Sequence, residues 1–252
     1  MPAGRSRAPR VRPTVSARAR DDRRRGVAPR LLPLALLFLA VAAPARAELA
    51  FSGTLATDER YRGDSVSGDR PVATFSIAYD DLHGPYAGIS FTAVARDGIA
   101  PLQSVQYVGY AKRLKSGVSI DVGLSHRFSS HYYTGEYARD VTEAYVGIVG
   151  RRMSAHIFLS PDYDRHGRAA AYAEVDDLLL DRGDWSLTGH IGALAPPKEA
   201  GERRPTLEVD GRLGATRRFG RMTLTLAAVG ATPTQESGHW RRTLLLSLTR
   251  SF

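Results

Sequence analysis

The chain has 252 residues, with 35 lysines and arginines against 26 aspartates and glutamates, and it contains no cysteine. The absence of cysteine excludes a disulfide scaffold, thiolate metal sites and a cysteine nucleophile. Residues 1–47 hold 11 of the basic and 2 of the acidic residues, so the rest of the chain carries 24 of each and has no net charge. A basic surface of the kind that binds nucleic acid is therefore not indicated.

The N-terminal region is typical of a secretory signal peptide. Residues 31–43 read LLPLALLFLAVAA, which is shorter than the roughly 20 apolar residues of a membrane-spanning helix. Arginines precede this run, and Ala45-Arg46-Ala47 follows it as an A-x-A cleavage site. We predict Sec-type export, with residues 1–47 as the signal peptide and 48–252 as one mature domain. The leader is long, and a start codon at Val27 would give it an ordinary length.

Residues 48–252 show no convincing helix but a series of segments, each of about ten residues, with period-two alternation. The clearest is 117–128, where Ile120, Val122 and Leu124 share one face and polar side chains the other. The run 176–180 breaks phase and predicts a β-bulge. Twelve strands are predicted, with starts near Glu48, Pro71, Gly84, Leu102, Gly117, Ala138, Met153, Ala169, Asp184, Thr206, Gly220 and Trp240.

The connections between these segments alternate in length. Short turns fall at 80–83, 115–116, 150–152, 182–183 and 219–220, whereas the longer polar connections are 59–70, 96–101, 129–137, 164–168, 196–205 and 232–239. Short turns at one end and longer loops at the other are the pattern of an up-and-down outer-membrane barrel. An even strand count leaves both ends of the mature chain on the short-turn, periplasmic side.

Two features favour a membrane barrel over a soluble β-domain. The apolar faces are rich in alanine, glycine, valine and leucine, which suits lipid contact without close core packing. Aromatic residues also recur near the strand ends on the short-turn side and in phase with the apolar faces, as in an interfacial girdle. The predicted girdle consists of Phe51, Tyr79, Trp185 and Phe252. The predicted fold class is all-β, a transmembrane up-and-down antiparallel barrel of about twelve strands.

The last predicted strand ends the chain on an aromatic residue, with Leu244, Leu246, Leu248 and Phe252 on one face. An open edge in lipid leaves backbone groups unpaired, so this strand is predicted to pair with the first one. An alternating last strand with a terminal aromatic resembles the signal that the barrel-assembly machinery reads. That machinery is therefore an expected partner, together with outer-membrane lipids and lipopolysaccharide.

Several short motifs resemble those of the TorF-type porin family, the Gcw_chp-like outer-membrane β-barrels of proteobacteria. They are Phe51-Ser52-Gly53, Tyr61-Arg62-Gly63, Tyr86-Ala87-Gly88, Asp121-Val122-Gly123-Leu124, Tyr132-Tyr133-Thr134-Gly135, Thr142-Glu143-Ala144-Tyr145-Val146-Gly147, Ser160-Pro161-Asp162-Tyr163 and Arg250-Ser251-Phe252. The resemblance spans essentially the whole mature chain. It implies an outer-membrane barrel with a transport role, and none of the motifs is catalytic.

The polar faces supply the candidate lining of a lumen. Charged side chains in a pore select ions and solutes by sign. The alternative is that these charges only pair across neighbouring strands and fill the interior. Roughly eight strands leave room only for side chains and roughly sixteen leave an aqueous channel, so twelve strands keep both alternatives open. The candidates are Asp121, Arg127, Glu143, His156, Glu174, Asp176, Glu208, Asp210 and Arg212.

No catalytic, metal or cofactor site is predicted. His126, Ser129, Ser130 and His131 could belong to an outer-membrane hydrolase, but His126 and His131 point to opposite faces of a strand. The acidic residues of the first long connection, Asp58, Glu59, Asp64 and Asp69, match no calcium-loop spacing and favour a solvated loop.

The predicted function is passive diffusion of small hydrophilic solutes or ions across the bacterial outer membrane. The main alternative is a non-conducting barrel with a structural or surface-binding role in the envelope, and a lipid hydrolase is less favoured. The oligomeric state is left open.

Overall fold

The computed structural model describes residues 47–134, 140–163, 167–195, 207–233 and 241–252. The predicted signal peptide lies outside this part of the chain, except for Ala47. No helix within the described ranges is long and apolar enough to cross a membrane. Every helix or strand found in these ranges is a strand.

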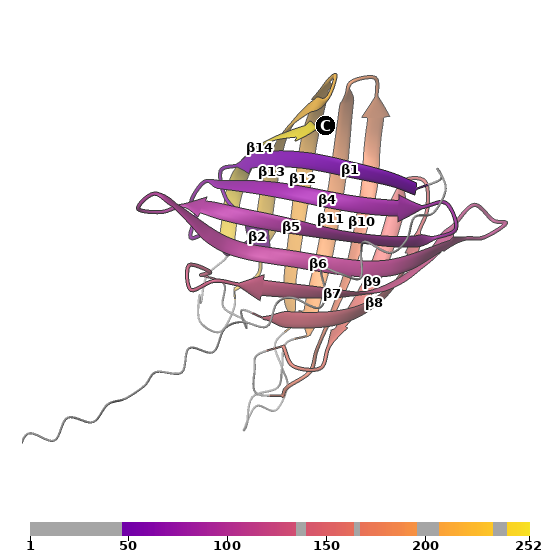
Figure 1. Cartoon of the computed structure of the whole chain (residues 1–252), viewed down its shortest axis with the longest axis horizontal. Helices are drawn as coiled ribbons and strands as arrows, with labels where there is room; N and C mark the ends of the chain where they lie inside the picture. The colour runs from indigo at the N-terminus through magenta and orange to yellow at the C-terminus, as the bar shows by residue number, and fades with distance from the viewer. Residues whose placement is uncertain (1–46, 135–139, 164–166, 196–206, 234–240) are drawn as a thin grey trace, which may run out of the picture. The chain divides into compact units, whose positions relative to one another are not determined.

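Twelve antiparallel strands form a closed barrel, in which neighbours along the chain are also neighbours in space (Figure 1). No observed start is more than three residues from its predicted position, which confirms the fold class and the strand count. The strands are β1 (Ala47–Ala56), β4 (Val72–Asp81), β5 (Pro85–Ala95), β6 (Ile99–Arg113), β7 (Ser119–Ser129), β8 (Val141–Val149), β9 (Met153–Ser160), β10 (Ala170–Arg182), β11 (Trp185–Ala195), β12 (Glu208–Phe219), β13 (Met222–Ala231) and β14 (Arg241–Ser251).

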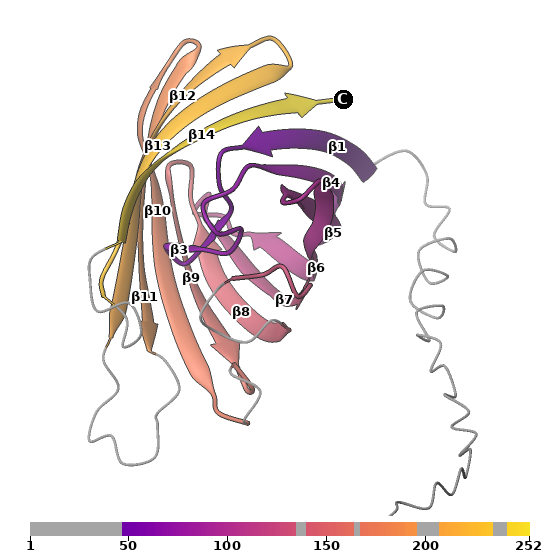
Figure 2. The ribbon, with the colours of Figure 1, turned by 90° about the vertical axis from the view of Figure 1, so that its left-hand side faces the viewer.

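The barrel closes through β1 and β14, which lie side by side in Figure 2. Their register runs from Ser52 opposite Ser251 to Ala56 opposite Ser247. The hydroxyls of Thr54 and Thr249 are 2.9 Å apart across this seam. The predicted pairing of the first and last strands is therefore confirmed, and it removes the sheet edges that lipid would leave unpaired.

Two bulges interrupt the ladders. The register of β10 and β11 shifts between Leu178 and Leu180, at the predicted position. A second shift separates Thr92 from Ala93 where β5 pairs with β6, and it leaves Leu102 as the extra residue of β6. Leu102 is fully buried. This bulge breaks the alternation at the start of β6, which explains why the sequence placed that start three residues late.

The apolar side chains face outward and the polar side chains face inward. In β7, Val122 and Leu124 are 42% and 53% exposed, whereas Asp121 between its apolar neighbours is 9% exposed. Neighbouring strands repeat the pattern, with Val146, Ile157 and Leu213 exposed. A soluble barrel has the reverse arrangement, so the direction of the faces is that of a membrane barrel.

This orientation predicts an accessibility difference between adjacent positions. In protein reconstituted in lipid vesicles, a water-borne thiol reagent is expected to label Asp121→Cys and to leave Ile120→Cys unreacted, because only position 121 faces water. The native chain has no cysteine, so labelling reports the introduced residue alone. Faster reaction at position 120 would show that the faces are inverted.

The four aromatic residues proposed as a girdle lie near the short-turn end of the barrel. Trp185 and Phe252 are 51% and 62% exposed, and the rings of Phe51 and Phe75 stack with centroids 6.5 Å apart. The Arg217 guanidinium lies 5.2 Å from the Trp185 ring centroid. Exposed aromatic rings beside arginine suit a headgroup interface, and the girdle role stays a prediction.

Candidate functional site

The connection between β1 and β4, residues 57–71, folds inside the ring of strands, and we call it L1 (Figure 2). Its centre is a hairpin of β2 (Arg60–Tyr61) and β3 (Asp64–Ser65), joined by Arg62 and Gly63. Both linking residues have positive φ, 51° and 82°, which defines a two-residue primed turn. This backbone suits Gly63 but costs Arg62 roughly 1–2 kcal/mol, so contacts of the Arg62 side chain must offset it.

Arg62 supplies those contacts by reaching the opposite wall of the barrel. It donates a hydrogen bond of 2.7 Å to Oε1 of Glu143 and one of 2.9 Å to the Tyr163 hydroxyl. The side chains of Arg62 and Glu143 are only 7% and 9% exposed. The guanidinium carbon lies 4.0 Å from the Tyr172 ring centroid, 5.4 Å from that of Tyr163 and 5.9 Å from that of Phe158.

We call the four wall residues around this guanidinium the Arg62 pocket: Glu143, Phe158, Tyr163 and Tyr172. Burial by itself lowers the pKa of Arg62, but Tyr61, Tyr163 and Glu143 together raise that pKa above its ordinary value. Arg62 therefore stays cationic in the pocket. A buried cation paired with a carboxylate and covered by aromatic faces is a strong anchor for L1.

Further contacts hold the rest of L1 against the wall. Asp64 pairs with Arg241 of β14, and within L1 Arg60 pairs with Asp58 at 2.8 Å. A Cβ atom built on Gly63 lies 2.6 Å from the Cβ of Ala231, so the turn packs closely against β13. On the other side, Val66 is fully buried in a cluster of buried apolar residues with Val72, Val94, Ala100, Leu102 and Tyr133.

The expectation of a solvated acidic first loop is wrong for Asp58, Glu59 and Asp64 but holds for Asp69, whose side chain is 73% exposed. Asp58 is 6% exposed and accepts hydrogen bonds from Ser65 and Ser67. Burial raises the pKa of Glu59, and Arg127 partly opposes that rise. Asp58 is buried, and Glu59 and Asp64 are half-buried, because arginine and serine partners inside the lumen replace their water.

Little space remains beside the tip of L1. The cavity between Arg62 and the wall of β12 and β13 has a volume of about 10 Å³ and is lined by Asp64, Asp210 and Ala231, among others. A single water molecule needs about 10–15 Å³. The space between the hairpin tip and the wall of β12 and β13 is therefore too small for a solute while L1 keeps this position.

Along one wall, carboxylates and imidazoles alternate in a row. His156 lies 3.2 Å from Asp121 and 4.0 Å from Glu174, measured between ring nitrogens and carboxylate oxygens. His190 lies 2.9 Å from Asp176 and 3.2 Å from Asp210. We call these six residues the acid–histidine row: Asp121, His156, Glu174, Asp176, His190 and Asp210.

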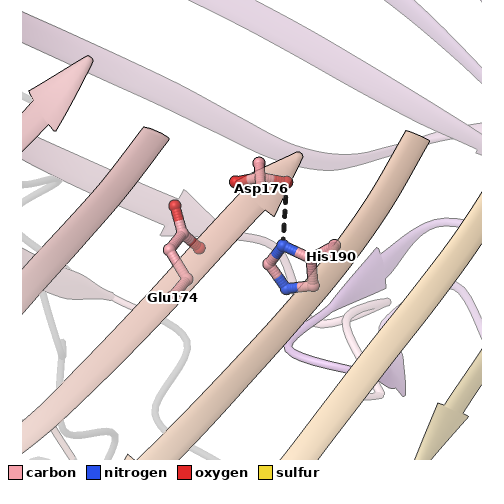
Figure 3. Close-up of side chains that lie close together, drawn as sticks. All are labelled: Glu174, Asp176 and His190. Carbon is pink, nitrogen blue, oxygen red and sulfur yellow. Dashed lines mark hydrogen bonds and ion pairs between the residues drawn. The ribbon is translucent and has the colours of Figure 1, made fainter. Parts of the chain in front are cut away.

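Part of this row has the donor types of a metal site (Figure 3). Glu174, Asp176 and His190 each offer one ligand atom, and these three atoms lie within 4.8 Å of one another. Both ring nitrogens of His190 are hydrogen-bonded, Nδ1 to Asp176 and Nε2 to Asp210. His190 thus bridges two carboxylates, and a metal ion would have to displace one of those contacts. We therefore do not assign a metal to this group, although its side chains are of the types that bind one.

A row of aromatic side chains runs across the same wall. Tyr86 lies 6.0 Å from Tyr107 between ring centroids, and its hydroxyl is 2.6 Å from that of Tyr145. Phe158 continues the row, 5.4 Å from Tyr145 and 6.2 Å from Tyr172. This side of the lumen therefore combines aromatic faces with carboxylates.

The structure places the nine predicted lining residues in three settings. Asp121, His156, Glu174, Asp176 and Asp210 belong to the acid–histidine row. Glu143 and Arg127 contact L1, with the Arg127 guanidinium 3.3 Å from the Tyr61 ring centroid. Arg212 lies 4.0 Å from Asp176, and Glu208 lines the small cavity beside the hairpin tip. Whether they line an open pore stays a prediction.

Sequence reasoning missed several residues that complete this wall. His190, Tyr86, Tyr107, Tyr145 and Tyr172 alternate in phase with the inward faces of their strands, so stricter phase counting could have found them. In the sequence, Tyr61 and Arg62 were noted only as part of a motif that resembles the family, and no role in the lumen was predicted for them. Nothing in the local sequence shows which wall L1 contacts.

The residues considered for a hydrolase do not meet. His126 lies on the exposed face of β7 and bonds Thr142 at 2.8 Å, whereas Ser129 is 6% exposed on the inward face. Ser130 donates its hydroxyl to the backbone oxygen of Pro101. The described residues therefore show no Ser–His pair at these positions.

A closed antiparallel barrel with an apolar outer surface and an ionisable inner wall defines the class of outer-membrane β-barrels. A family model described as "Bacterial protein of unknown function (Gcw_chp)" matches residues 42–240. The chain belongs to this family, which confirms the family resemblance seen in its motifs.

Solved structures of porins share the fold. The KdgM porin matches with a TM-score of 0.50 and 10% identity, over 81% of this chain and 99% of that chain. The NanC porin matches with a TM-score of 0.52 and 8% identity over the same shares. KdgM has also been solved in complex with disordered oligogalacturonate. No curated protein sequence matches this chain. At such low identity the likeness shows the fold alone.

Proposed function

We propose that the protein is an outer-membrane channel for passive diffusion of small hydrophilic solutes or ions, with L1 as its constriction. The observation that carries the proposal is the inside-out barrel, in which leucine and valine face outward and a row of ionisable side chains faces inward. Lipid requires the first feature, and a water-accessible lumen favours the second. Outer-membrane lipids, lipopolysaccharide and the barrel-assembly machinery are the partners this location implies.

Single-channel recording in planar bilayers tests the proposal. The purified protein is expected to give discrete, salt-dependent current steps, which become larger and more frequent when the L1 hairpin is removed. The small cavity beside the hairpin tip favours a second candidate, a non-conducting barrel with a structural role. Silence at every voltage, even without the hairpin and with the barrel folded, would support that candidate.

Ion selectivity offers a finer prediction, because two accessible lumen residues of opposite charge lie close together. The side chains of Asp176 and Arg212 are 40% and 52% exposed and 4.0 Å apart. Asp176→Asn is expected to lower the ratio of cation to anion permeability about twofold, and Arg212→Gln to raise it by a similar factor.

The measurement is the reversal potential in a salt gradient, made on the variant without the hairpin so that currents are large. Each substitution serves as the matched control of the other. Equal shifts of the same sign would show that the two side chains do not face the conducting path.

A further inference from the structure

The Arg62 pocket has the composition of a receptor for an organic cation. Its carboxylate, Glu143, forms a 2.7 Å ion pair, and three aromatic rings have centroids between 4.0 and 5.9 Å from the guanidinium carbon. All four wall residues come from β8, β9, β10 and the connection after β9, whereas the cation comes from L1. The wall thus provides a site that another part of the same chain fills.

We infer that this pocket binds small solutes bearing a guanidinium or alkylammonium group, and that Arg62 occupies it as an internal substitute for such a solute. The inference rests on the proposed channel function and names the solute class. A solute cation that enters the pocket takes the place of Arg62, and L1 then loses its main anchor. Binding of the solute and opening of the lumen are in this way coupled.

Two rings of the pocket are held in place by contacts that do not involve L1. The Tyr172 hydroxyl lies 3.0 Å from Asp210 and 3.2 Å from His190. Phe158 packs against Tyr145, with ring centroids 5.4 Å apart. These contacts lie on the barrel wall, so the rings of Phe158 and Tyr172 keep their arrangement when L1 leaves. A preorganised site is what competition between solute and Arg62 requires.

The chemistry selects against neutral solutes and simple metal ions. A neutral solute would leave the Glu143 carboxylate without a counter-charge, and an unpaired charge in a buried setting is costly. Hard metal ions prefer oxygen ligands, whereas three of the four pocket residues present ring faces, which attract organic cations. The Glu143 carboxylate also accepts a hydrogen bond of 3.1 Å from Tyr61 of L1.

Nearby charges shape the approach to the pocket. Asp121, Glu174, Asp176 and Asp210 contribute four carboxylates along the wall, and His156, His190 and Arg212 oppose them. Arg127 lies against Tyr61 and disfavours a second positive charge beside the pocket. A solute cation is therefore accepted in place of Arg62 rather than in addition to it.

The test follows the burial of L1 through a single cysteine. Val66 is fully buried, so Val66→Cys reports release of L1 by its reaction with a water-borne maleimide. Methylguanidinium is the probe, and methylurea is its neutral counterpart of nearly the same shape. We expect methylguanidinium to raise the labelling rate of Cys at position 66 about tenfold, in line with the loss of a buried ion pair, and methylurea to leave it unchanged.

Matched variants keep the result interpretable. Leu82→Cys, at a 79% exposed position in the turn after β4, checks that neither probe alters reagent chemistry. In the Val66→Cys background, Arg62→Ala is expected to label fast without any probe. Glu143→Gln is expected to label faster than the parent and to lose the response to methylguanidinium. Heat-modified mobility in gels verifies that each variant is folded.

Two results would overturn the inference. One is a wild-type pocket that ignores methylguanidinium, or responds equally to methylurea, while Arg62→Ala labels fast. The other is an Arg62→Ala variant that labels no faster than its parent. Currents in potassium chloride, with no effect of methylguanidinium on the labelling rate, would contradict this inference but not the channel function. A labelling rate that rises with methylguanidinium, in a protein that gives no current in any variant, would contradict the proposed channel function instead.

Discussion

Replacing the hairpin residues 60–65 by a short glycine linker is expected to raise single-channel conductance by about an order of magnitude, because the hairpin fills space in the lumen that water and ions then occupy. In the present structure the hairpin crosses the lumen from β1 to Glu143 of β8 and to Arg241 of β14. The space beside its tip is about 10 Å³. Removing the hairpin also removes Arg62 and Asp64, so Glu143 and Arg241 then face water.

A milder variant should act in the same direction. Gly63→Val places a branched side chain at a φ of 82° and against Ala231, so the turn can no longer pack against β13 in its present position. Asp97→Gly is the matched control. Asp97 also has a positive φ in a three-residue turn at the long-loop end, between β5 and β6, but it is exposed. Conductance is expected to change in Gly63→Val and not in Asp97→Gly.

Unchanged conductance after loss of the hairpin would contradict the assignment of L1 as the constriction. In that case the current-limiting element lies elsewhere in the lumen. The thermal stability of the barrel, measured alongside, separates this outcome from a collapsed pore.

Placing an arginine on the lipid-facing surface is the second change with a large expected effect. Leu246 is 46% exposed at the middle of β14, beside Leu226 of β13. Leu246→Arg is expected to lower the free energy of unfolding in lipid vesicles by about 2–4 kcal/mol, the cost of an arginine near the bilayer midplane. The measurement is urea-induced unfolding followed by tryptophan fluorescence.

The control for this substitution is the next residue along the strand. Ser247 faces inward, opposite Thr225 of β13 and Ala56 of β1. Ser247→Arg is expected to cost less, because its guanidinium can reach lumen water. Equal losses at both positions would show that β14 does not separate lipid from water in this way.

Much of the fold could be predicted because its signals are local. Period-two alternation and the short turns located the start of every barrel strand to within three residues, and the phase break at 176–180 located the bulge at Leu178 and Leu180. The short strands β2 and β3 of L1 were not predicted. The bulge at Leu102 was missed, because a single extra residue there mimics a later strand start. The inward phase of Asp121, Glu174 and Asp210 followed from the same alternation.

The candidate site likewise has a part that local sequence patterns predict and a part that they do not. Its wall could be anticipated residue by residue, although His190 and the inward tyrosines were overlooked. The Arg62 pocket could not, because Arg62 meets Glu143 across 81 residues and Tyr163 across 101 residues of sequence. The buried state of Asp58 and Glu59 depends on the same long-range placement of L1.

By itself, then, the amino-acid sequence determined a twelve-stranded antiparallel sheet with one apolar and one polar face, since each strand's pattern depends only on neighbours two residues apart. Only the tertiary structure decided that the first long loop turns inward and that its arginine fills a pocket of aromatic rings and a carboxylate. This pocket depends on side chains that closure of the barrel brings together, and no short stretch of the chain encodes it.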